Sequence, residues 1–431
     1  MKHMKRILSV LLLISLLPLL PLTAAAEGEA GGTPGPKTVY VSPSGDDATA
    51  AVGDKTRPYA DFLTAYGQLT QTGGTVVLLD DVTIDLTTDE YKAVASAHRF
   101  KLPASEKEIA ICGTRQEGGQ YSNLIFKNTT GVCVELQGDV TFYDLTIGFT
   151  TDKSGSNLWF AANGYRITIG FRFSHAFKSA KGNIVGGAQA AGVGIPMNTA
   201  YGPTVTVYSG TWNNIFAASF ASGIIEKTAT INLCGDLSAA IVAPCRNKAA
   251  GTLKADAVIN YYKGTVTDFY DYGKAVTLNA YNGLQETVKT TFTNTTESQV
   301  VVCGESLPAP AYALNFYGTQ VTAVNEQRKY SVRFVGTLHS TDYSAVGLLI
   351  RTAFQTYGGC CEKVYTSIFG DFERYTAEAL GGNYLFAWTI QNIPADAGAV
   401  TFTVTPFLAV GDTVWYGQEK SVTYQAGILQ Q

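Results

Sequence analysis

One short pattern occurs three times between residues 201 and 273 and constrains the fold more than any other feature. The copies are Thr204–Gly210 (TVTVYSG), Thr230–Gly235 (TINLCG) and Val258–Gly264 (VINYYKG). Each alternates apolar and polar residues and ends in glycine, and the glycines lie 25 and 29 residues apart. A period of roughly 20–50 residues is typical of a solenoid, whose repeats bury their apolar sides on one another. We therefore predict a coil of short strands, each ended by a glycine.

Similar strand–turn units precede these copies, so residues 74–283 would make roughly eight turns stacked ~4.8 Å apart. The L-x-x-L-x-L pattern that a leucine-rich solenoid needs is absent. The fold class expected for this segment is all-β, a right-handed parallel β-helix spanning 38–283. Residues Pro58–Thr70 have helical apolar spacing, and a helix there would cap the open end of the coil.

The first 26 residues are typical of a secretion signal. A basic start precedes the apolar run Ile7–Leu22, and Ala24–Ala26 supplies small residues for cleavage. A flexible Gly/Pro-rich leader, 27–37, follows, and no second apolar span is present. We expect a secreted or cell-surface protein that has no membrane attachment after cleavage.

Charge argues against nucleic acid as a partner. Three of the 31 basic residues and none of the 35 acidic ones lie in the signal, which leaves 28 against 35 and a net charge of −7. Such a surface repels phosphate backbones.

Seven cysteines are too few for a disulfide scaffold of this size. Cys112, Cys133 and Cys234 lie in or beside apolar strands, where buried free thiols are expected. The adjacent Cys360 and Cys361 could form a vicinal disulfide or bind a metal, but no histidine lies at ligand spacing to them.

The last third of the chain changes character. Residues 284–310 are a linker or a last rung, and 311–431 are predicted to form a β-sandwich of alternating strands. The expected strands are Ala313–Tyr317, Tyr330–Leu338, Ala345–Ala353, Val364–Ile368, Tyr384–Ile390, Val400–Pro406, Val414–Tyr416 and, as a possible eighth, Ser421–Tyr424.

Three segments near the start resemble the opening of secreted bacterial proteins of the pectin-lyase-like β-helix superfamily. They are Thr38–Asp47 (TVYVSPSGDD), Arg57–Pro58 and Gly73–Ile84 (GGTVVLLDDVTI). The resemblance covers about 38–283 and implies the coil fold. Because the superfamily includes lyases, hydrolases, epimerases and non-catalytic adhesins, it leaves activity open.

Four C-terminal segments resemble a module found at the ends of large secreted proteins of Gram-positive gut bacteria. They are Ser331–Val335, Tyr343–Gly347, Val364–Ile368 and Thr401–Pro406. This resemblance implies location rather than activity.

Alternation places one strip of side chains on the outside of the coil. If Val205, Ile231 and Ile259 point inward, Thr206, Asn232 and Asn260 point outward. This strip is neutral, whereas a polysaccharide lyase needs a cation and a strong base, and a hydrolase needs paired carboxylates. Stacked threonine and asparagine can equally cover a solvated sheet.

The catalytic candidates are turn carboxylates. Asp236 and Asp268, on adjacent turns, could act as acid and base, and Asp271 lies nearby; the alternative is that all three solvate loop ends. Arg166 and Arg172 with Asp144 form a second weak candidate, for a lyase. Clustered Asp46, Asp47 and Asp54 could hold calcium or could simply shape a surface turn.

Tyrosines supply a different kind of site. Tyr208, Tyr262, Tyr270 and Tyr272 fall on neighbouring turns, where aromatic faces can stack on sugar rings while Asn232 and Asn260 bind hydroxyls. Trp212 has the position of a core residue. An inert aromatic surface is the alternative.

These observations favour a secreted or cell-surface carbohydrate-binding, adhesin-like β-helix protein without catalysis. Its partner would be an extracellular polysaccharide or glycoprotein glycan, and we expect a monomer that needs no cofactor. A polysaccharide lyase or glycoside hydrolase is the second hypothesis, and a structural spacer that presents the sandwich is the third.

Overall fold

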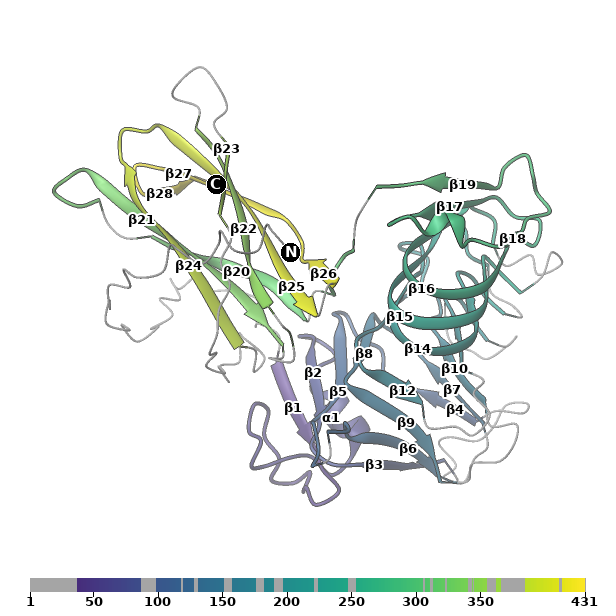
Figure 1. The fold of residues 1–431 in the computed structure, drawn as a ribbon. Helices are drawn as coiled ribbons and strands as arrows, with labels where there is room; N and C mark the ends of the chain where they lie inside the picture. The colour runs from purple at the N-terminus through teal and green to yellow at the C-terminus, as the bar shows by residue number, and fades with distance from the viewer. Residues whose placement is uncertain are drawn as a thin grey trace. The chain divides into compact units, whose positions relative to one another are not determined.

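Stacked parallel strands form the first and larger part of the fold (Figure 1). The computed structural model describes residues 37–86, 98–117, 119–127, 131–150, 157–175, 182–189, 197–220, 224–246, 253–304, 307–310, 313–321, 324–339, 343, 345–354, 362–365, 384–410 and 413–430. The expected signal, nearly all of the leader and the pair Cys360–Cys361 lie outside these ranges.

The first sheet of the coil pairs each strand in parallel with its equivalent on the next turn. Its strands are β1 (Lys37–Val41), β2 (Gly74–Leu78), β5 (Ile109–Gly113), β8 (Val140–Tyr143), β11 (Arg166–Ile169), the first halves of β14 (Thr204–Phe216), β15 (Ala229–Ala243) and β16 (Ala257–Tyr270), then β17 (Val276–Ala280) and β19 (Gln299–Val302). Between β2 and β17 the described residues supply eight strands, as the expected eight turns require.

Two more parallel rows complete each early turn. The second row is β4 (His98–Lys101), β7 (Gly131–Glu135), β10 (Asn157–Ala161), β13 (Gly182–Val185), the second halves of β14, β15 and β16, and β18 (Thr290–Thr291). The third row is β3 (Val82–Asp85), β6 (Asn123–Lys127), β9 (Leu145–Phe149) and β12 (Phe173–His175). Three-sided turns stacked in register define a parallel β-helix.

Inward side chains form continuous apolar columns, as the alternation predicted. Val207, Leu233 and Tyr261 occupy equivalent positions on successive turns and are at most 3% exposed. Burying one such side chain contributes about 1.5–3 kcal/mol. Thr168 pairs with Thr206 and extends the outward strip by one turn.

The recurring glycines mark corners rather than strand ends, so the expectation that each strand stops there is wrong. Three long strands pass through these glycines from the first sheet into the second row: β14, β15 and β16, which are 13, 15 and 14 residues long and contain Gly210, Gly235 and Gly264. The pairing shifts register at these corners. Gly210 and Gly264 have φ of 95° and 117°, a region that L side chains rarely adopt.

The expected capping helix is present but shorter. α1 (Phe62–Gly67) begins after Asp61, whose carboxylate accepts a hydrogen bond from the Thr64 amide at 2.6 Å. Phe62, Ala65 and Tyr66 are buried in the core of the coil. The helix therefore begins at Phe62, with Asp61 as its N-terminal cap, rather than at Pro58.

Residues 284–304 belong to the coil, which settles the choice between linker and last rung for this part. The 3-10 helix η2 (Leu284–Glu286) follows β17, and β18 and β19 pair with β16 and β17.

The C-terminal part is a sandwich of two antiparallel sheets around one apolar core. All eight expected strands are present in whole or in part, and β28 was not anticipated. The sheets contain β20 (Leu314–Val321), β21 (Lys329–Leu338) and β24 (Tyr384–Pro394), and β22 (Ala345–Phe354), β23 (Glu362–Tyr365), β25 (Ala399–Val410), β26 (Thr413–Tyr416), β27 (Lys420–Gln425) and β28 (Ile428–Gln430).

The coil and the sandwich belong to one compact unit that extends from Gly35 to Gln431. Within the described ranges, no helix has the length and apolar character needed to cross a membrane.

The corner geometry predicts a large cost for Gly235→Ala. A Cβ at Gly235 would lie 2.1 Å from the carbonyl oxygen of Tyr208, which is backbone and cannot rotate away. We expect a loss of about 2 kcal/mol in the free energy of unfolding, measured by urea denaturation. Gly304→Ala is the matched control because its Cβ would meet open space. Equal stability of the two variants would contradict the corner role.

Candidate functional site

A surface hollow of about 500 Å³ lies where β14, β15 and β16 turn their corner. We call it the corner groove. It spans three successive turns, and η2 contributes Leu284 to its lining. The lining residues are Gly210, Thr211, Asp236, Leu237, Ser238, Lys263, Gly264, Thr265 and Leu284.

A row of hydroxyls crosses the groove from turn to turn. Thr211 pairs with Ser238, and Ser238 pairs with Thr265, so the three side chains occupy equivalent positions. Thr211 and Thr265 are exposed and Ser238 is half-buried. Neighbouring strands lie ~4.8 Å apart, so the hydroxyls repeat at that spacing along the coil axis.

One ion pair stands beside this row. Lys263 Nζ lies 3.1 Å from Asp236 Oδ1, and the Asp236 side chain is 83% exposed while that of Lys263 is 30% exposed. An exposed pair of this kind adds little to stability. Its carboxylate and ammonium can therefore exchange partners with a ligand at small cost.

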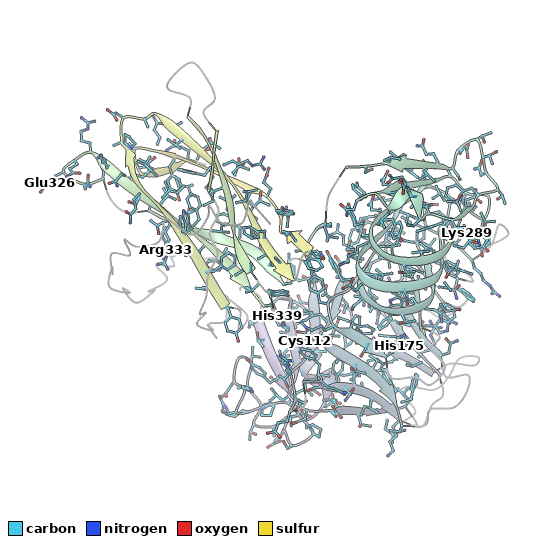
Figure 2. All side chains as sticks on the ribbon, in the orientation of Figure 1. Cys112, His175, Lys289, Glu326, Arg333 and His339 are labelled. Atoms are coloured by element: carbon cyan, nitrogen blue, oxygen red, sulfur yellow. The ribbon has the colours of Figure 1, made fainter. Side chains whose placement is uncertain are left out.

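The structure does not bring Asp236 and Asp268 together. Asp268 lies five residues beyond Lys263 on β16, past the corner and in the second row of strands. It is 6% exposed, and its oxygens contact Lys289 Nζ at 2.9 Å and the Thr291 hydroxyl at 3.1 Å (Lys289 is labelled in Figure 2). The proposed acid–base pair is therefore not supported.

Asp271 holds the last loop of the coil in place. Its carboxylate is fully buried and accepts hydrogen bonds from the amides of Gly273, Thr293 and Asn294 and from the hydroxyls of Thr293 and Ser298. Burial alone would raise the pKa of Asp271, but these donors outweigh it and hold the pKa below its ordinary value. This is a structural role.

The expected cluster of Arg166, Arg172 and Asp144 forms only in part. Arg172 donates to Asp144 at 2.7 and 3.2 Å, whereas Arg166 lies 3.8 Å from Asp139. Asp144 is 2% exposed and also contacts His339 Nε2 at 2.9 Å. Burial opposes ionisation, yet contacts with His339 and Arg172 lower the pKa of Asp144. The buried Asp144 carboxylate is therefore part of a structural ion pair.

The tyrosines are dispersed, and the expectation that Tyr208 is exposed is wrong. Tyr208 is 4% exposed, with the Phe171 ring against it at 5.1 Å. Tyr262 is half-buried and stacks on Tyr281 at 4.2 Å. Burial raises the pKa of Tyr262.

Tyr270 and Tyr272 stack on each other at 5.0 Å, with 9° between their planes. They pack on an apolar cluster of the second row that includes Trp159 and Phe216. None of the four tyrosines lines the corner groove. Trp212 is a core residue, 2% exposed, as expected.

Asn232 and Asn260 are part of a side-chain ladder. The Asn260 amide donates to Asn232 at 2.8 Å, Asn232 donates to the Thr206 hydroxyl at 3.0 Å, and Asn279 donates to Asn260 at 2.8 Å. The outward direction predicted for the strip is confirmed. The ladder uses these amides to join turns.

The calcium candidates serve as turn residues. Asp46 and Asp47 accept from backbone amides of Ala48 and Ala60, and Asp54 pairs with Arg57 at 2.8 Å. Bonds from Thr56 and Arg57 lower the pKa of Asp54 to about 2. In the part of the chain that the structure describes, no three His, Cys, Asp or Glu side chains gather to hold a metal ion.

Cys112, Cys133 and Cys234 are buried cysteines outside disulfides, as expected. Burial raises the pKa of Cys234 to about 12, so this thiol stays protonated at neutral pH.

Sequence reasoning missed Lys263 and the hydroxyls of Thr211, Ser238 and Thr265. For the hydroxyls the available signal was a polar residue within three positions after each glycine, and Lys263 directly precedes Gly264. Because the expected strands stopped at the glycines, that signal was not followed onto the next sheet.

The chain matches no protein-family model, and no curated protein or solved structure is significantly similar to it. What the fold and site define is a class: an all-β protein with a parallel coil, an antiparallel sandwich and one polar corner groove among its described residues.

Asp271→Asn should destabilise the chain by about 2 kcal/mol, because five donors lose a charged acceptor. The folded-state pKa of Asp271 is lowered, so its contribution is complete above the unfolded value of about 4 and is lost as pH falls through the folded pKa. Urea midpoints measured from pH 7 to pH 2 should therefore fall less steeply on the acid side in Asp271→Asn.

Exposed Asp256, changed to Asn, is the control and should follow the parent curve. Parallel acid limbs for the parent and Asp271→Asn would contradict the assignment.

Proposed function

We propose that this chain is a secreted or cell-surface carbohydrate-binding protein of adhesin-like type, in which the corner groove binds an extended glycan without cleaving it. The observation that carries the proposal is the row of hydroxyls on three successive turns beside the Asp236–Lys263 pair. Membership of the pectin-lyase-like superfamily, proposed from the N-terminal segments, fits the parallel coil.

The polar groups of the groove complement sugar hydroxyls. Asp236 can accept from two adjacent hydroxyls, Lys263 can donate to hydroxyl or ring oxygens, and the hydroxyl row can do either. Leu284 offers an apolar surface for a sugar face. Because the row follows the coil axis, the glycan would lie across the turns rather than along one strand.

The same groups argue against catalysis. Hydrolysis by two carboxylates needs a second acid near the first, and Asp236 is the one carboxylate among the described residues that line the groove. Lyase chemistry needs a strong base as well as a cation, and the only ionisable groups among the described lining residues are Lys263 and the weakly basic carboxylate of Asp236. Binding is the activity this chemistry supports best.

The test uses the chain from Glu27 onward and a panel of plant, host and microbial polysaccharides, with and without calcium. We expect binding of at least one glycan by calorimetry, and about tenfold weaker binding for Asp236→Asn and for Lys263→Met, as expected for one charge-assisted hydrogen bond. New reducing ends and unsaturated products are followed in the same samples.

The matched control is Glu226→Gln, which removes a similarly exposed carboxylate paired with Lys254 at 3.2 Å elsewhere on the coil. It should bind like the parent. Turnover that disappears in Asp236→Asn would show that the groove is a catalytic site and would contradict the proposed function. Binding that neither groove variant weakens would show that the glycan binds elsewhere.

A further inference from the structure

The ammonium of Lys263 is contacted by the C-terminal sandwich as well as by Asp236. Its Nζ lies 3.5 Å from the Thr413 hydroxyl and 5.0 Å from the centre of the Trp415 ring. Both partners belong to β26. A cation over a tryptophan face is attracted by the negative face of the ring, more strongly when water is excluded.

The strand that supplies these contacts is itself held firmly. Trp415 is 4% exposed and lies in the sandwich core, with the Phe171 ring of the coil edge-on at 5.4 Å. The Tyr416 amide donates to the Leu307 carbonyl at 3.1 Å, and the Ala309 amide donates to the Tyr416 carbonyl at 2.8 Å. β26 is thus fixed to the segment that leaves the coil.

This arrangement matters because Lys263 is otherwise weakly constrained. A lysine side chain has four rotatable bonds, and Asp236, 83% exposed, is too solvated to fix it alone. A ring and a hydroxyl held by a second domain restrict the ammonium before any ligand arrives. Restricting a binding group in advance reduces the entropy lost on association.

We propose that Thr413 and Trp415 are positioning residues of the corner groove, so that the sandwich completes a ligand site whose lining comes from the coil. The inference rests on the proposed function for its ligand, an extended glycan. It assigns the C-terminal domain a role in the site itself, beyond presenting or anchoring the coil.

The first measurement needs no ligand. Lys263 is labelled with a small amine-reactive reagent and quantified by mass spectrometry in Thr413→Val, Trp415→Leu and Trp415→Phe. We expect about threefold faster labelling in Thr413→Val and Trp415→Leu, and a rate near that of the parent in Trp415→Phe, which keeps a ring. Val414→Thr, on the same strand with its side chain 37% exposed, is the control.

The second measurement is glycan affinity of the same variants. Thr413→Val and Trp415→Leu should weaken binding about threefold, and neither should weaken it further when Lys263 is already Met. Such non-additivity separates positioning through Lys263 from a general loss of structure. Circular dichroism identifies any unfolded variant, and Thr413→Val, which keeps the side-chain shape, carries the test if Trp415→Leu fails to fold.

The outcomes separate the two proposals. Unchanged Lys263 labelling in Thr413→Val and Trp415→Leu would overturn the positioning role whatever the glycan result. Faster labelling with no glycan bound by the parent would support positioning and reject the proposed ligand. Weaker binding that persists in the Lys263→Met background would show that the sandwich acts by another route and would also overturn the inference.

Discussion

The structure depends on one constraint, that each turn of the coil presents the same side-chain direction as the turn below it. Parallel pairing places Val207, Leu233 and Tyr261 in one inward column and Asn232 and Asn260 in one outward ladder. A slip by one residue would exchange the two sets, burying amides and exposing apolar side chains. The pairing shifts at the corners of β14, β15 and β16 and resumes on the next side of the coil.

Alternation along single strands was sufficient to predict much of the fold. It gave the inward residues of the three repeats, the outward strip of Thr206, Asn232 and Asn260, the number of turns and the positions of the sandwich strands, because these follow from local periodicity. The corners were not predictable in this way. Gly235 resembles a strand terminus in sequence, and only the pairing of β15 with β14 and β16 on both sides of it shows that the strand continues past this residue.

The site was harder to predict for the same physical reason. Whether a turn carboxylate is buried or open to a ligand depends on donors from other segments. Asp271 is buried among donors 22–27 positions later, whereas Asp236 is 83% exposed beside Lys263. Tyr208 is covered by Phe171, from the preceding turn. The contacts that single out Lys263 come from Asp236 on the neighbouring turn and from Thr413 and Trp415 of the sandwich, so its own sequence neighbours do not predict them.

The asparagine ladder has a direction. Asn279 donates to Asn260, Asn260 to Asn232, and Asn232 to Thr206, so every amide points toward the N-terminal end of the coil. The next residue in the row is Val301 of β19, whose side chain can neither donate nor accept a hydrogen bond. The ladder is thus a short directional chain with a defined terminus. Whole turns could be inserted or deleted within it during evolution without changing the cross-section, while the valine-bearing turn would remain the stop.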